Sequence, residues 1–145
     1  MSWGKLLGDR RVTALPASKA ELDNLRSIVA RSLKDAAAAN LSADAQFVMA
    51  YDAARTLSLM IVRAEGYRPR LAGGHYNTFL ALEAADPSFA KLSAYFDGCR
   101  IKRNECEYVS AGSISDTDAQ GLLTTVRRFA TDCEAWIKGR HPALV

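Results

Sequence analysis

The feature that most constrains the fold of this chain is the recurrence of apolar residues at intervals of three and four. Four or five segments show this spacing, which is typical of helices that bury one face. No segment shows the sustained alternation of apolar and polar residues that a half-buried strand needs. The sequence therefore predicts an all-α protein. Short connections between the segments favour an antiparallel up-and-down bundle of four or five helices.

Helix-start residues divide the chain into these segments. Ser18 predicts the start of the first helix, with Glu21 placed three residues later to complete a capping box. Ser42 and Ser115 mark the starts of the second and last helices. Because the second helix is apolar on two sides, we expect it to lie at the centre of the bundle.

Proline and glycine locate the remaining boundaries. Residues 66–74 are predicted to form a loop that exposes Arg68 and Arg70, followed by a short helix around residues 76–84. Asp86 and the proline after it open a long helix that we expect to run from residue 88 to about residue 110. The two loop arginines either form a phosphate-binding patch or simply keep the loop soluble, and the second interpretation is favoured.

The length of 145 residues and the 49% content of hydrophobic residues predict one globular domain. We expect an N-terminal arm over residues 1–17, a helical-bundle domain over residues 18–139 and a C-terminal tail over residues 140–145, with His141 in a frayed end. Trp3 anchors the arm either on the bundle or on a partner. The net charge of +3 is too small for a dense basic coat, so any contact with nucleic acid must be local.

The three cysteines, Cys99, Cys106 and Cys133, are odd in number and fall inside helical patterns. We expect them to be reduced, buried thiols in a cytoplasmic protein. No apolar segment is long enough to span a membrane, and no signal peptide is recognisable. The usual metal-binding and nucleotide-loop motifs are missing, so no metal and no cofactor are predicted.

One arginine interrupts an apolar seam in the long helix predicted after Asp86. The seam runs at steps of three and four through Phe89, Leu92, Phe96, Cys99, Arg103 and Cys106. Burial of an unpartnered guanidinium is costly. Either the Arg103 head group is paired, or the seam opens there onto a cleft or a second protomer.

Further polar residues share this helix face because they lie three, four, seven and eight residues after Arg100: Arg103, Asn104, Glu107 and Tyr108. The simplest interpretation is an ion pair between Arg103 and Glu107 on a solvated face, with Tyr108 at its edge. The alternative is a functional site, because here the polar face continues the apolar stripe.

The segment RNECEY, from Arg103 to Tyr108, follows a central helix reading AYDAARTLSLMIVRAEGYRPR and a GGHY turn. With these features the chain resembles the HEPN family of small helical bundles over roughly residues 43–136. The resemblance implies an antiparallel bundle that forms a homodimer by bringing two copies of the motif together. It also implies RNA as a ligand, a toxin–antitoxin or defence setting, and a minimal nucleotidyltransferase as a partner protein.

Carried onto this chain, the resemblance gives Arg103 the place of the motif arginine and Asn104 that of its polar neighbour. Tyr108 stands where the family has a histidine. Arg103, Asn104 and Tyr108 are therefore the predicted catalytic residues of a metal-independent endoribonuclease. A tyrosine with an ordinary pKa is a poor base at neutral pH, so binding of RNA or a nucleotide survives this replacement better than cleavage does.

The predicted RNA- or nucleotide-binding residues are Arg100, Arg103, Glu107 and His75. His75 follows two glycines at a helix start, where it either serves the structure or approaches the Arg103 face in the folded bundle. A second hypothesis is a catalytically inert bundle that interacts with the nucleotidyltransferase. In that case the family resemblance suggests Tyr108 as an acceptor for a nucleotidyl group.

Overall fold

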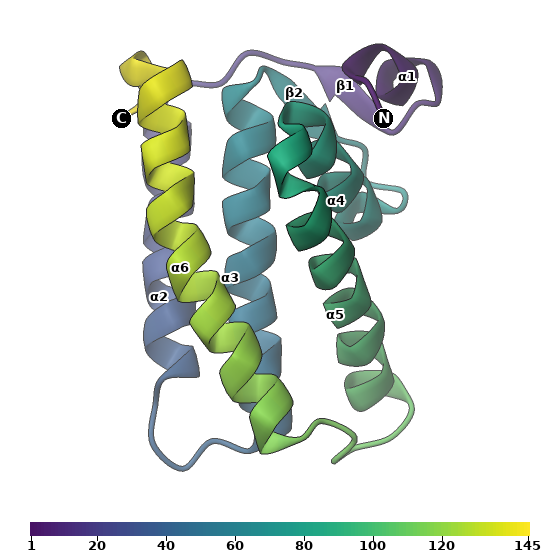
Figure 1. Ribbon diagram of the computed structural model, residues 1–145, viewed down its shortest axis with the longest axis vertical. Coiled ribbons are helices and arrows are strands. Elements are labelled where there is room, and N and C mark those ends of the chain that lie inside the picture. Colours follow the sequence, from purple (N-terminus) through teal and green to yellow (C-terminus); the bar gives the residue numbers. More distant parts are fainter.

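The computed structural model describes all 145 residues and is mostly helical, which confirms a helical bundle (Figure 1). The elements are α1 (Trp3–Gly8), β1 (Val12–Ala14), α2 (Lys19–Ala36), α3 (Ala43–Ala64), β2 (Tyr67–Pro69), α4 (Gly74–Ala85), the 3-10 helix η1 (Pro87–Phe89), α5 (Ala90–Tyr108), α6 (Asp116–Arg140) and the 3-10 helix η2 (Pro142–Leu144). The long helices α2, α3, α5 and α6 alternate in direction, and the shorter α4 lies beside the upper part of α3. No helix is both long and apolar enough to cross a membrane.

Serine caps begin three of the long helices, as the sequence predicts. The side-chain oxygens of Ser18, Ser42 and Ser115 accept hydrogen bonds of 3.2, 3.1 and 3.0 Å from backbone N–H groups in the first turns of α2, α3 and α6. Each such cap is worth about 1 kcal/mol. The predicted capping box at α2 is wrong, because Glu21 turns away from Ser18 and pairs with Arg63.

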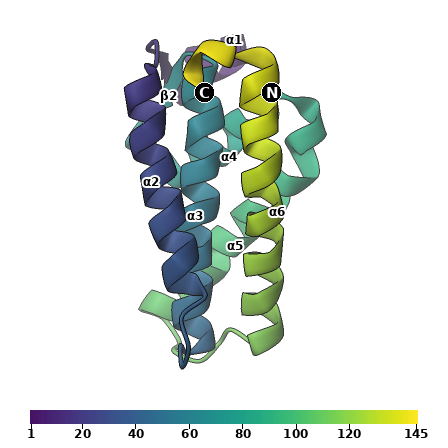
Figure 2. The ribbon, with the colours of Figure 1, turned by 90° about the vertical axis from the view of Figure 1, so that its left-hand side faces the viewer.

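Helix α3 is the centre of the fold and lies between α2 and α6 in the rotated view (Figure 2). It buries residues on both of its apolar stripes, including Phe47 and Tyr51 on one and Ala53 and Met60 on the other. Across the bundle, Phe96 of α5 lies 5.8 Å from Phe79 of α4 and 5.6 Å from Phe129 of α6 between ring centroids. Such aromatic pairs add about 0.5–1.5 kcal/mol each to the burial of apolar area. The three cysteines are free and buried.

A two-stranded antiparallel sheet connects the N-terminal arm to the bundle, so the prediction that residues 66–74 are entirely loop is wrong. Val12 pairs with Pro69 and Ala14 pairs with Tyr67. Trp3 stacks on Tyr67 with 4.1 Å between ring centroids, which anchors the arm on the bundle. Strands of three residues are too short to show a period of two, which explains why the sequence pattern does not reveal them.

Arg63 of α3 binds the end of the N-terminal arm and the start of α2. Its side chain is only 4% exposed and forms two hydrogen bonds with the Glu21 carboxylate, at 2.9 and 3.0 Å. The same guanidinium donates to the backbone carbonyls of Leu15, Pro16 and Tyr67. All of its donor nitrogens therefore have partners, which offsets the cost of burying the charge.

The C-terminal end is ordered, so the expectation of a frayed tail is wrong. His141 lies 2.8 Å from a Glu65 carboxylate oxygen, and Arg140 makes an ion pair with the same carboxylate at 3.4 Å. The carbonyl of Leu144 accepts a hydrogen bond from Arg26 of α2. These contacts hold the end of α6 against α2 and α3.

Candidate functional site

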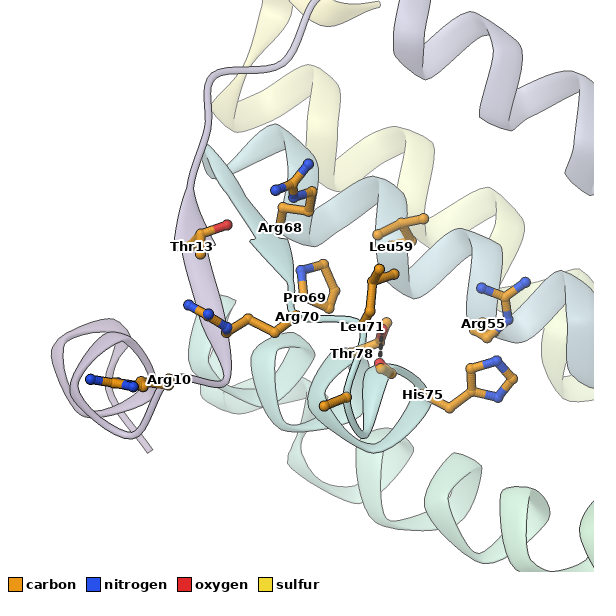
Figure 3. A pocket seen from close by; sticks show the side chains of 12 residues that line it. Arg10, Thr13, Arg55, Leu59, Arg68, Pro69, Arg70, Leu71, His75 and Thr78 are labelled. Carbon is orange, nitrogen blue, oxygen red and sulfur yellow. Dashed lines mark hydrogen bonds between the residues drawn. The ribbon is translucent and has the colours of Figure 1, made fainter.

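A cleft of about 820 Å³ lies between the sheet, α3 and the first turns of α4 (Figure 3). Four arginines line it, and they come from three separate parts of the chain: Arg10, Arg55, Arg68 and Arg70. Thr13, His75 and Thr78 add polar groups, whereas no Asp or Glu side chain lines the cleft. The arrangement concentrates positive charge in a chain whose net charge is only +3.

The four cleft arginines have neither ion pairs nor side-chain hydrogen bonds, in contrast to five other arginines that hold carboxylates: Arg26, Arg63, Arg100, Arg103 and Arg140. The Nε atom of Arg55 is buried without a partner. A guanidinium offers a planar fork of donors that fits phosphate or carboxylate oxygens. The cleft therefore presents unused donors suited to an anion.

Local backbone geometry places the arginines on the cleft wall. Arg68 lies in β2, where it is paired with Thr13, and Arg70 is the first residue after the strand. Arg10 has a φ of 57°, a left-handed conformation that costs a residue with a side chain about 1–2 kcal/mol. The turn that carries Arg10 is thus held in place by the surrounding structure.

The start of α4 forms another part of the wall. Gly73 adopts a φ of 69° at the N-cap, and no side chain caps the helix. Gly74 and His75, the first residues of α4, line the cleft. The positive end of the helix dipole therefore adds to the arginine charges on this side.

His75 connects the cleft to the interior of the bundle. Its Nδ1 lies 3.0 Å from the hydroxyl of Tyr51, a fully buried residue of α3. Burial, with further contributions from Arg55, Arg103 and Arg100, lowers the pKa of His75 to about 4, so the ring is neutral at pH 7. Burial raises the pKa of Tyr51 well above its ordinary value, so the phenol keeps its proton.

Arg103 approaches the same tyrosine from α5, with its guanidinium carbon 5.9 Å from the centre of the Tyr51 ring. It makes an ion pair with Glu107 at 3.3 Å and a hydrogen bond with Asn104 at 3.4 Å, so its head group is paired. Its Nε is nevertheless buried without a partner. Arg103 does not line the cleft, but it shares the Tyr51 contact with His75.

The other predicted site residues are divided between two places. Arg100 makes an ion pair with Asp97 at 2.7 Å. Its guanidinium carbon also lies 5.5 Å from the ring centre of Tyr76, the residue that follows His75 in the sequence. Tyr108 is 74% exposed at the end of α5 and has neither a hydrogen bond nor a ring contact with the others. The structure therefore brings His75, Arg100 and Arg103 around Tyr51 and Tyr76, and leaves Tyr108 outside this group.

Sequence reasoning missed Tyr51, Arg55 and Arg10 as site residues. Tyr51 was assigned to an apolar stripe, which is correct for its ring but says nothing about its hydroxyl. The useful indication was Asp52 together with Arg55, two charged residues within the most apolar helix. Both are only half-buried, and burial raises the pKa of Asp52 although Arg55 and Arg103 oppose that shift.

The chain matches no protein-family model, no curated protein and no solved structure. No group of three or more His, Cys, Asp or Glu side chains is placed to hold a metal ion. The candidate site is therefore defined by its own geometry, which is that of an arginine-lined cleft bordered by a neutral histidine.

Proposed function

We propose that this protein binds single-stranded RNA through phosphates held in the arginine-lined cleft. The observation that carries the proposal is the group of four unpaired arginines with no carboxylate among them: Arg10, Arg55, Arg68 and Arg70. Because none of these guanidinium groups makes an ion pair with a carboxylate of the protein, an incoming phosphate does not have to displace an internal partner. The HEPN-like motif on α5 supports RNA as the class of ligand.

Direct binding of a fluorescently labelled single-stranded RNA, followed by anisotropy, tests this proposal. We expect Arg55→Gln to weaken binding about tenfold, because it removes a bidentate phosphate contact. Arg31→Gln is the matched control, since Arg31 is exposed on α2 and makes no ion pair. An equal effect of the two substitutions, or no RNA binding by the wild type, would contradict the proposal.

A second candidate function is metal-independent RNA cleavage, which the contact between Tyr51 and His75 favours. With Nδ1–H donating to the Tyr51 oxygen, Nε2 of neutral His75 is free to take the proton of a ribose 2′-hydroxyl. The 2′-oxygen then bonds to phosphorus and the 5′-oxygen leaves, taking a proton from water. Arg55 lines the same cleft and would stabilise the negative charge on the phosphorane.

Cleavage of labelled RNA in the presence of EDTA tests the second candidate. We expect His75→Gln to abolish cleavage while the protein stays folded, and Arg103→Ala to reduce it through the shared Tyr51 contact. Tyr108→Phe should leave the rate unchanged, because the Tyr108 hydroxyl lies outside the group. No cleavage by the wild type would rule out this candidate for the isolated protein.

Absence of both RNA binding and cleavage would favour the inert interaction module. In that case the exposed hydroxyl of Tyr108 is the group open to modification by a nucleotidyltransferase. Incubation with such an enzyme and a labelled nucleotide, comparing wild type with Tyr108→Phe, would test that alternative by mass spectrometry.

A further inference from the structure

We infer that the cleft holds one nucleoside between two separate phosphate subsites, so that its minimal ligand carries phosphates on both the 3′ and 5′ sides of a base. This inference rests on the proposed function and specifies which part of an RNA strand the cleft recognises. It distinguishes an internal nucleotide of a strand from a free nucleotide whose phosphates all lie on one side.

Apart from Arg10, the arginines of the cleft fall into two clusters, with neutral His75 beside one of them. Arg55 of α3 and His75 of α4 lie together at one end in Figure 3. Arg68 of β2 and the adjacent Arg70, with Thr13 of β1 opposite Arg68, lie at the other end. A single phosphate can occupy only one of these clusters, whereas two phosphates of a strand can occupy both.

Two hydrophobic residues of the cleft, Leu59 and Leu71, lie between the two clusters (Figure 3). Leu59 is one helical turn after Arg55 on α3, on the way to β2. Leu71 lies in the short connection between Arg70 and α4. An apolar surface bordered by cations at both ends matches a base or sugar with a phosphate on either side.

Leu71 is the most informative of these residues because its side chain is 99% exposed. The loop that carries it is held at several points: the Leu71 carbonyl accepts from Gly74 N–H at 3.0 Å, and the Ala72 carbonyl accepts from the Asn77 amide at 2.9 Å. The N–H of Arg70 donates to the carbonyl of Arg11 at 2.9 Å. These hydrogen bonds hold the loop in a conformation that leaves the Leu71 side chain exposed to water. The side chain is buried only when a ligand covers it, and that burial would stabilise the complex.

Competition against a labelled single-stranded RNA tests the inference with three small probes. These are adenosine 3′,5′-bisphosphate, ADP and inorganic tripolyphosphate. The bisphosphate and ADP each carry two phosphate groups, but only the bisphosphate has phosphates on both sides of the nucleoside. We expect it to compete at least about tenfold more strongly than ADP.

Leu71→Ser supplies an independent measurement, and folding should not be affected because Leu71 is fully exposed. We expect this substitution to weaken binding of the bisphosphate and of RNA about three- to tenfold, and to leave tripolyphosphate binding unchanged. Val109→Ser is the matched control, since Val109 is 81% exposed at the far end of α5 and does not line the cleft.

The failures of the two proposals differ. If RNA binds but ADP competes as well as the bisphosphate, or if Leu71→Ser has no effect on either nucleotide or RNA, the two-subsite inference is overturned while the proposed function stands. If the wild type binds no RNA, the proposed function itself is wrong.

Discussion

The hydroxyl of Tyr51 lies 3.0 Å from Nδ1 of His75, which joins the buried centre of α3 to the first turn of α4. Through this contact a residue on the cleft wall is oriented by the core of the bundle. Arg103 meets the same tyrosine ring from α5. His75 and Arg103, which sequence reasoning grouped as candidate RNA-binding residues, therefore share one buried partner.

Replacement of Tyr51 by phenylalanine should measure this contact. The ring packing is kept while the hydrogen bond is lost, so we expect the free energy of unfolding to fall by about 1 kcal/mol. Urea denaturation monitored by circular dichroism gives the value. Tyr108→Phe, which removes an exposed hydroxyl without a partner, is the control and should change stability by less than about 0.5 kcal/mol. Equal effects would show that the Tyr51 hydroxyl contributes nothing.

The depressed pKa of His75 makes stability depend on pH in a defined direction. Between its ordinary pKa of 6.5 and its folded value of about 4, the unfolded chain binds a proton that the folded protein does not. The free energy of unfolding should therefore fall as the pH decreases through this range. For a partly exposed ring we expect a contribution of about 1 kcal/mol. His75→Gln should reduce the loss by that amount in denaturation curves recorded across the range; an unchanged pH dependence would contradict the assignment.

Loss of the Arg63 side chain should be among the most destabilising changes. Arg63→Ala leaves the Glu21 carboxylate without its buried partner and three backbone carbonyls without their donor. We expect a loss of about 3–5 kcal/mol in the free energy of unfolding. Lys102→Ala, which breaks an exposed ion pair with Asp118, should cost less than about 1 kcal/mol. Similar costs for the two substitutions in chemical denaturation would contradict this account of the arm.

Much of the fold could be predicted because it depends on patterns formed by residues close together in the sequence. The serine caps and the two apolar stripes of α3 depend on residues only a few positions apart, and each was found where expected. Glu21 shows the limit of such patterns. A capping box and a buried ion pair both use a glutamate, and only the tertiary position of Arg63, 42 residues away, decides between them.

The candidate site was harder to predict because its parts are distant in sequence. Arg10, Arg55 and Arg68 line one cleft only because β1 pairs with β2 next to the end of α3. The motif on α5 drew attention to Arg103, which lies close to the site, and to Tyr108, which does not. Helical spacing identifies residues on one face, but it does not say where along the helix that face meets another element.

The salt dependence of RNA binding tests the central claim most directly. For single strands, each phosphate contact contributes about 0.7 to the slope of log K against log salt concentration. Because Arg68 and Arg70 form one phosphate subsite, the double variant Arg68→Gln/Arg70→Gln should lower that slope by about 0.7 relative to the wild type. Arg127→Gln/Arg128→Gln removes the same charge from exposed positions on α6 and should leave the slope unchanged. Equal changes of the slope in both double variants would show that RNA binding depends only on the overall charge of the protein. That result would contradict a specific RNA-binding site in the cleft.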